Sequence, residues 1–217
     1  RMLPLSKNTP KPLIDINGVT LLDNSINFLK KLGCTQIIIN THYLSEQFQN
    51  LIKHRHDKKN IILIKEKNIL DTGGGVKNMI SNITNKHVLI VNSDIFWREE
   101  NLIDAQLLID SYNYNTKTHL LLSHKLRSFG MVKNNGDFIL SGNRILRYKY
   151  GDNICFYSGL QILPINIFEA FKQKKFSFNL IWDYLILREK LFGNIMQSNW
   201  YHVGDIQGLR IAKQLNS

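Results

Sequence analysis

Two hydrophobic patterns alternate along the first half of the chain. Continuous short apolar runs, typical of strands covered on both faces, occur at 36–40, 61–64, 87–91 and 119–124. Segments with apolar residues at helical spacing lie between them, at 20–32, 44–53 (with Ser45 as its expected cap), from the glycines at 73–75 to about 83, and 102–111. Strands that alternate with helices predict an α/β fold with a doubly wound, mostly parallel sheet, whose functional side chains lie at strand C-termini.

The pattern changes after Phe129 to short alternating pieces separated by turns. Asn134–Asp137 has the composition of a hairpin turn, and residues 154–163 return to a long apolar run. We therefore expect one domain over residues 1–217, with 129–163 as a small antiparallel insertion. Helices are predicted at 164–172, at 180–191 and after Asp205.

Composition narrows the class of protein. The chain has 217 residues, of which 43% are apolar, so it can bury a sizeable core. It has no apolar run of about 18 residues, which argues against a membrane span. Its two cysteines read as buried small hydrophobes, which suits a reducing cytoplasm.

The net charge of +11 favours anionic partners. Nucleic acid and anionic membrane surfaces are alternatives, but the lysines are spread along the chain and no zinc-finger spacing or RNA-binding aromatic signature occurs. We expect small anionic substrates, with neither nucleic acid nor membrane as a partner.

Three segments carry candidate chemistry. Lys11 lies between Pro10 and Pro12, which predicts a stiff, extended backbone that presents its ammonium to a phosphate; a solvated surface loop is the alternative. The glycines at 73–75, between a strand and a helix, permit positive φ values and close approach to a ligand, although a flexible loop explains them as well. Asp94, just past a predicted buried strand, is suited to Mg²⁺, or alternatively to capping the next turn.

These segments together resemble one family. R-M-L-P-L-S followed by T-P-K-P-L, at residues 1–13, resembles the second half of the signature of sugar-1-phosphate nucleotidyltransferases. D-T-G-G-G (71–75), N-S-D (92–94) and Y-S-G (157–159) resemble further motifs of that family, and the resemblance covers nearly the whole chain. The spelling is most similar to the short bacterial uridylyltransferases that act on N-acetylmuramate 1-phosphate in peptidoglycan recycling. The first half of the signature, an apolar strand and a glycine-rich turn, is expected upstream of Arg1.

The resemblance implies a role for each of these positions. Catalysis is expected from Arg1, which would neutralise the leaving pyrophosphate, from Lys11 at the α-phosphate, and from Asp94, which would hold Mg²⁺. Nucleotide contacts are expected from Thr72, Gly73 and Gly74, and sugar contacts from Gly159 and Asn179, with 129–163 on the sugar side.

One position departs from the family pattern. W-Y-H-V-G-D, at 200–205, resembles a W-x-D-x-G step that supplies a second metal carboxylate, but His202 stands where Asp is expected. Imidazole is a poor ligand for Mg²⁺. Either His202 contacts metal or phosphate less directly, or Asp205 substitutes, or Mg²⁺ relies on Asp94 and substrate oxygens; a packing histidine is the structural alternative.

The resemblance implies a reaction that joins a nucleoside triphosphate, with UTP favoured, to a sugar 1-phosphate, with N-acetylmuramate 1-phosphate as the expected sugar substrate. Guanylyl, thymidylyl or cytidylyl transfer are alternatives, as is a nucleotide-sugar-binding homologue without catalysis.

Overall fold

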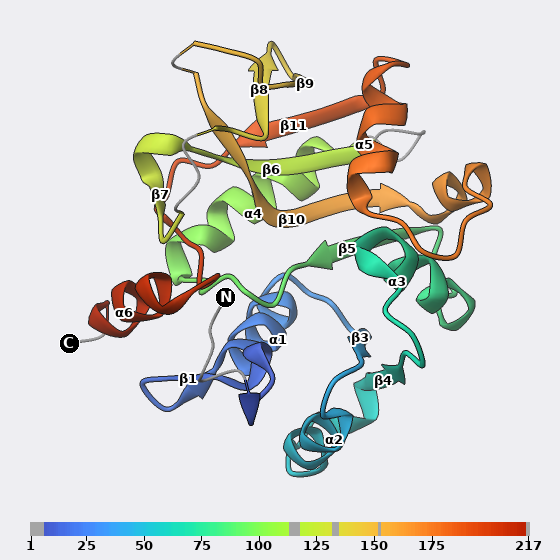
Figure 1. Ribbon diagram of the computed structural model, residues 1–217, viewed down its shortest axis with the longest axis vertical. Coiled ribbons are helices and arrows are strands. Elements are labelled where there is room, and N and C mark those ends of the chain that lie inside the picture. The colour runs from blue at the N-terminus through green and yellow to red at the C-terminus, as the bar shows by residue number, and fades with distance from the viewer. Residues whose placement is uncertain (1–6, 113–117, 132–134, 152, 216–217) are drawn as a thin grey trace.

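A six-stranded sheet forms the centre of the molecule in the computed structural model, which describes residues 7–112, 118–131, 135–151 and 153–215 (Figure 1). Its strands follow the order β5-β10-β6-β11-β9-β8. Their bounds are β5 His87–Val91, β10 Cys155–Pro164, β6 Thr118–His124, β11 Leu191–Ile195, β9 Arg144–Arg147 and β8 Phe138–Ser141.

The long strands of this sheet share one direction, with one exception. β10 is antiparallel to both β5 and β6, and β11 is parallel to β6. β5, β6 and β11 therefore run the same way, and β10 is inserted against them. β8 and β9 form an antiparallel pair at the edge.

Helices cover both faces of the sheet, because the strands are apolar on both. Leu120 and Leu122 of β6 join a cluster with α3 (Asp71–Met79) and α5 (Phe178–Ile186). Leu121 joins the cluster on the other face, with α4 (Glu99–Ser111) and Phe28 of α1 (Leu21–Lys31). The predicted α/β class is confirmed.

A second, two-stranded sheet lies below the first in Figure 1. It consists of β3 (Ile37–Thr41) and β4 (Ile61–Lys65), which pair in parallel from Ile37–Ile61 to Thr41–Lys65. The amphipathic helices α1 and α2 (Ser45–Lys53) pack their apolar faces onto it through Ile26 and Phe48.

The remaining elements are short. β1 (Asp15–Ile16) and β2 (Val19–Thr20) form a hairpin, β7 (Ser128–Phe129) pairs in parallel with β12 (Trp200–Tyr201), and α6 (Ile206–Gln214) is the last helix. The 3₁₀ turns are η2 Lys11–Leu13, η3 Lys58–Asn60, η4 Ile80–Asn82, η5 Lys125–Arg127 and η6 Ile165–Ala170.

Several predicted boundaries are wrong for local reasons. The β8–β9 hairpin turns at Gly142, where φ is +62°, and not at 134–137, of which residue 134 lies outside the described residues. The predicted helix at 164–172 is the 3₁₀ segment η6, and the helix at 180–191 ends at Ile186, since Leu191 begins β11.

The start of α2 also differs from the prediction. Leu44, at φ +52°, is its N-cap residue, and Ser45 is the first residue of the helix. No helix among the described residues is long and apolar enough to cross a membrane.

Candidate functional site

Lys11 and Asp94 meet at the C-terminal end of β5. Lys11 Nζ donates a hydrogen bond to Asp94 Oδ2 at 3.0 Å, across 83 residues of sequence. Their side chains are 28% and 31% exposed, so both remain accessible to a ligand. The structure thus brings together the two described residues predicted to be catalytic.

The backbone of Lys11 differs from the prediction. Lys11 begins the 3₁₀ turn η2 instead of lying extended, with Leu13 N donating to Pro10 O at 2.8 Å. The turn and the flanking prolines still fix the backbone, so the ammonium is held in place by the fold as well as by Asp94.

His202 approaches the same carboxylate from the other end of the chain. Its Nε2 lies 3.5 Å from Asp94 Oδ2, and Trp200 stacks on its ring at 5.6 Å between centroids. Two backbone contacts fix this approach: an isolated bridge joins His202 to Ile95, and Val203 N donates to Asp94 O at 2.7 Å. The structure therefore places His202 beside Asp94, and its role there stays a prediction.

These neighbours decide the ionisation of Asp94. Burial alone raises the pKa of Asp94, but the hydrogen bond with His202 and the positive charge of Lys11 outweigh it and hold the pKa well below its usual range. Asp94 is consequently an anion at neutral pH, the form that binds a cation.

Tyr157, in the Y-S-G motif, carries a buried polar group to which the sequence analysis assigned no role. Its hydroxyl is buried and makes no hydrogen bond among the described residues, while its ring packs edge-on against Trp182 at 4.8 Å. Burial, followed by the negative charge of Asp94, raises the pKa of Tyr157 well above its usual value. Tyr157 is thus a neutral phenol at physiological pH, and its place in the Y-S-G motif is the signal that could have drawn attention to it.

The three glycines lie inside helix α3, not in a loop before it, and none has positive φ. A Cβ on Gly73 would lie 2.6 Å from the Phe176 ring, and one on Gly74 would overlap the carbonyl oxygen of Lys174. Gly73 and Gly74 therefore permit close packing of α3 against residues 174–176. Their predicted nucleotide contacts stay predictions.

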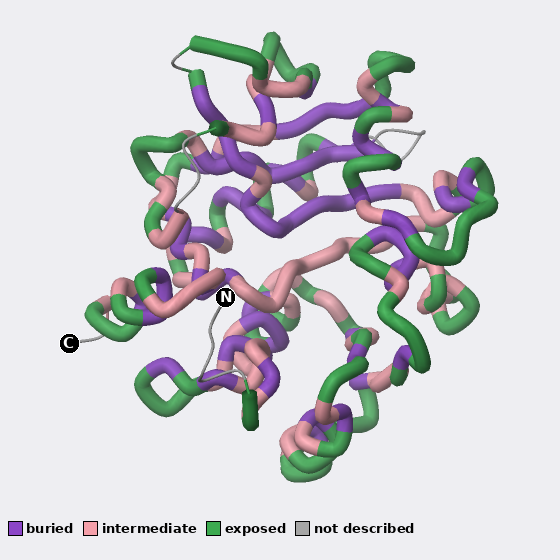
Figure 2. The backbone as a smooth tube through the Cα atoms, viewed as in Figure 1, coloured by how far each residue is buried: buried purple, intermediate pink, exposed green. Residues whose placement is uncertain are grey.

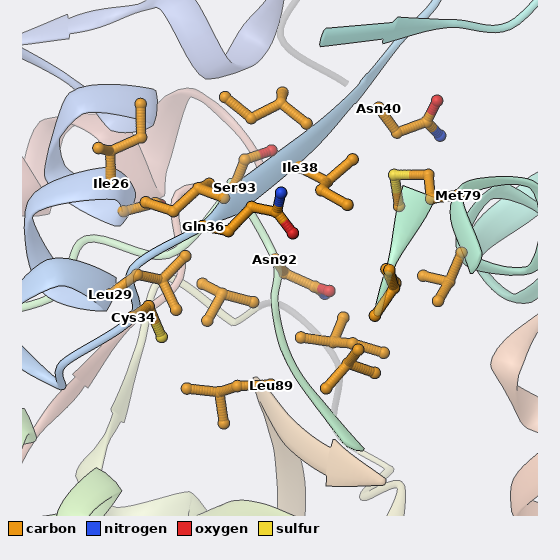
Figure 3. A pocket seen from close by; sticks show the side chains of 18 of the residues that line it. Ile26, Leu29, Cys34, Gln36, Ile38, Asn40, Met79, Leu89, Asn92 and Ser93 are labelled. Carbon is orange, nitrogen blue, oxygen red and sulfur yellow. The ribbon is translucent and has the colours of Figure 1, made fainter. Parts of the chain in front are cut away.

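Thr72 lies in the first turn of α3 and faces a cavity that it shares with Lys11 and Asp94. Its hydroxyl oxygen accepts a hydrogen bond from Phe178 N at 3.0 Å, which ties α3 to α5. Figure 3 shows Asn92 and Ser93, from the N-S-D motif, beside the same cavity.

The two predicted sugar contacts have structural partners within the protein. Gly159 has φ +88° at a register shift between β10 and β6, and its added Cβ would lie 2.9 Å from Ile95 Cγ1. The alternative interpretation of Gly159 as a bulge is therefore confirmed. Asn179 Oδ1 accepts from Arg147 Nη2 at 2.9 Å, so any sugar contact by Asn179 involves Arg147 as well.

The predicted metal ligands are only partly assembled. Asp205 is the N-cap of α6, where its Oδ1 accepts from Gly208 N at 2.9 Å. No group of three or more His, Cys, Asp or Glu side chains suited to a metal occurs among the described residues. A single carboxylate at Asp94 fits Mg²⁺, which takes one or two carboxylates together with substrate phosphates. The metal roles of Asp94, His202 and Asp205 stay predictions, and Arg1 lies outside the described residues.

Comparison with known proteins identifies the family. The family described as Nucleotidyl transferase matches residues 1–150. The chain belongs to this family. Two relatives match over almost the full chain at 26% identity: N-acetylmuramate alpha-1-phosphate uridylyltransferase of Caulobacter vibrioides (98% of this chain, 90% of the relative) and D-glycero-alpha-D-manno-heptose 1-phosphate guanylyltransferase of Aneurinibacillus thermoaerophilus (99% and 92%). The expected enzyme class, a sugar-1-phosphate nucleotidyltransferase, is confirmed.

Solved structures confirm the fold. HddC from Yersinia pseudotuberculosis superposes with a TM-score of 0.78 at 21% identity, covering 99% of this chain and 93% of that one. A putative glucose-1-phosphate thymidylyltransferase from Bacillus anthracis superposes with a TM-score of 0.80 at 15% identity, covering 99% and 89%. The nucleotidyltransferase therefore has the nucleotide-diphospho-sugar transferase fold that its sequence predicts.

Proposed function

We propose that this nucleotidyltransferase joins UTP to N-acetylmuramate 1-phosphate, giving the UDP-sugar and pyrophosphate, as a step of peptidoglycan recycling. The observation that carries the reaction type is the accessible pair of Lys11 and Asp94 at the end of β5. The choice of substrates is supported by the full-length similarity to the Caulobacter uridylyltransferase.

The chemistry asks the protein to bring together two polyanions. A phosphate oxygen of the sugar 1-phosphate attacks the α-phosphorus of the triphosphate; the new P–O bond forms as the bond to pyrophosphate breaks. The attacking oxygen is already an anion, so no protein nucleophile is needed, and catalysis rests on position and charge.

Each site residue has one task in this proposal. When substrate binds, Lys11 gives up its hydrogen bond with Asp94 and contacts the α-phosphate instead. There its ammonium offsets negative charge. Asp94 would hold Mg²⁺, which would supply positive charge that offsets the charge of the substrate phosphates. Thr72 contacts the nucleotide, and Arg1 offsets the charge of pyrophosphate.

A second pair of substrates is supported by a relative with the same sequence identity. The heptose 1-phosphate guanylyltransferase of Aneurinibacillus matches at the same 26% over a similar length. GTP with a heptose or mannose 1-phosphate is therefore the competing pair. The cytoplasmic location stays a prediction.

The test is pyrophosphate release by the folded enzyme with Mg²⁺, over a matrix of UTP, GTP, dTTP and CTP against N-acetylmuramate, heptose, mannose and glucose 1-phosphates. We expect the largest kcat/KM for UTP with N-acetylmuramate 1-phosphate. Faster release with another pair would keep the reaction and replace the substrates. Binding of nucleotide by folded protein without release for any pair would overturn the proposal in favour of a binding protein.

A further inference from the structure

An arginine at the edge of the sheet lies at the same end of the sheet as the candidate site. Arg147 is the last residue of β9 and is paired with Phe138 of β8. Phe138 is also paired with Cys155 of β10, which in turn faces His124 at the C-terminal end of β6. Because β5 and β6 run in the same direction, this register places Arg147 at the end of the sheet that carries Asp94.

Arg147 also lies on the face of the sheet that α3 and α5 cover. Ile145, two residues earlier in β9, packs in one cluster with Val76 of α3, and side chains two apart in a strand share a face. The guanidinium lies over the ring of Phe138, at 4.8 Å from the centroid, and over that of Trp182 of α5, at 5.9 Å. Stacking on two aromatic rings stabilises the cation and fixes the plane of its donors.

Two side chains of α5 hold the guanidinium by hydrogen bonds. Arg147 Nε donates to Asp183 Oδ1 at 2.7 Å, and Nη2 donates to Asn179 Oδ1 at 2.9 Å. The third nitrogen, Nη1, makes no hydrogen bond with any residue that the structure describes. The side chain of Arg147 is 30% exposed, so an external anion can reach a guanidinium whose position is already fixed.

The start of α5 connects this arginine to the cavity. Asn179 follows Phe178, whose backbone N–H donates to Thr72 Oγ1 at 3.0 Å. Thr72 and Phe178 line the cavity together with Lys11 and Asp94. A sugar 1-phosphate that occupies this cavity can thus direct a substituent of its ring toward Asn179 and the arginine.

The charge of Arg147 favours an acidic substituent over a neutral one. A guanidinium stays protonated at every physiological pH, and its planar donors match the oxygens of a carboxylate. N-acetylmuramate carries a carboxylate on the lactyl ether at C3, in addition to the phosphate at C1. Heptose, mannose and glucose carry only hydroxyl groups on the ring, and a hydroxyl does not require a permanent positive charge.

We propose that Arg147 is a specificity-determining residue, which binds the lactyl carboxylate through the Nη1 side of its guanidinium and so selects N-acetylmuramate 1-phosphate over neutral sugar 1-phosphates. Asp183 and Asn179 hold the other two nitrogens in place. The inference deepens the proposed function, on which it rests for the choice of sugar, and it separates the two competing pairs of substrates.

The test compares two ligands that differ only at C3. N-acetylglucosamine 1-phosphate is N-acetylmuramate 1-phosphate without the lactyl ether, so the ratio of their dissociation constants isolates the carboxylate. Binding is measured by titration calorimetry with Mg²⁺ and, in parallel, the α,β-methylene analogues of UTP and GTP, which cannot release pyrophosphate. We expect the wild type to bind the N-acetylmuramate ligand about tenfold more tightly or better, and Arg147→Gln to bind the two ligands about equally. Equal binding by the wild type, or an unchanged ratio in Arg147→Gln, would overturn the proposal.

Arg144 offers a matched control on the same strand. It begins β9 beside the exposed turn of the hairpin, residues 141–144 (Figure 2), and its Nη1 pairs with Glu189 Oε2 at 2.6 Å. Arg144→Gln therefore removes one positive charge and one exposed ion pair from the same hairpin. We expect this variant to keep the wild-type ratio. A fall in the ratio as large as that in Arg147→Gln would assign the preference to net charge and not to the Arg147 guanidinium.

The binding test is separate from the test of the proposed function. A preference for the acidic sugar that depends on Arg147, without pyrophosphate release for any pair of substrates, would support this inference and overturn the proposed reaction. Release with UTP and N-acetylmuramate 1-phosphate, from an enzyme that binds both sugars equally, would keep the reaction and overturn the role of Arg147.

Discussion

β5 and β6 are neighbours of the same strand, β10, and have similar apolar sequences, yet they are buried to different extents. β6 has a strand along each edge and lies in the core. Among the described residues β5 has β10 on one edge and the cavity of the candidate site on the other, and its C-terminal end carries Asp94. The difference teaches that burial of a strand in a sheet depends on its edges as well as its faces. In this enzyme the less buried strand carries the candidate site.

Substitutions at the C-terminal ends of β5 and β6 should differ most in their effect on enzyme activity. We expect Lys11→Ala and Asp94→Asn each to lower kcat/KM by about 100-fold or more, as for the loss of a charged group that acts on the transition state. His124→Ala, at the end of β6, should retain turnover within about threefold of the wild type. Full activity in a folded Lys11 or Asp94 variant would remove that residue from the mechanism.

Substitutions in the middle of β5 and β6 should differ most in their effect on the free energy of unfolding. Leu121 of β6 and Leu89 of β5 pack in the same cluster, but Leu121 is 0% exposed and Leu89 is partly exposed beside the cavity. We expect Leu121→Ala to lower the free energy of unfolding by about 3 kcal/mol and Leu89→Ala by about 1 kcal/mol. Urea denaturation measures both, and equal losses would contradict the assignment of β5 to an open edge.

Two glycines extend the comparison to close packing. A Cβ on Gly193 of β11 would lie 2.5 Å from the carbonyl oxygen of Leu120, in fixed backbone of the core. A Cβ on Gly75 would lie 2.7 Å from Asn40 Nδ2, the end of a side chain beside the cavity. We expect Gly193→Ala to destabilise by about 2–3 kcal/mol and Gly75→Ala by about 1 kcal/mol, as measured by thermal unfolding. The reverse order would show that the cavity side is the more rigid of the two.

The smallest effect concerns pH. Because the folded-state pKa of Asp94 is depressed, its contribution to stability is fully present above its unfolded pKa of about 3.9 and is lost as the pH falls toward the folded value. Asp94→Asn should therefore reduce the loss of stability between pH 6 and pH 3 by about 1 kcal/mol or less, the size typical of a partly exposed pair. Asp57, whose pKa is lowered mainly by its hydrogen bond with Arg55, titrates in both proteins and cancels in the comparison. Identical acid profiles would show that Lys11 and His202 do not stabilise the Asp94 anion.

The sequence by itself predicted the α/β class, most of the longer helices and strands, and which residues meet at Asp94. Periodicity places β5 at its observed bounds, His87–Val91. The motifs around Lys11, Asp94 and His202 predicted that residues from three distant segments share one site. A motif can be recognised from its residue types and spacing alone, without knowledge of the contacts in the fold.

Only the tertiary structure decided how those elements are used. Gly73 and Gly74 have a packing role that depends on Lys174 and Phe176, which lie about a hundred positions away in the chain. The antiparallel insertion of β10, the buried hydroxyl of Tyr157 and the open edge of β5 are likewise set by which strands become neighbours. A local pattern records the two faces of a strand, but the partners along its edges are chosen by long-range pairing, and this is why the cavity became visible only in the folded molecule.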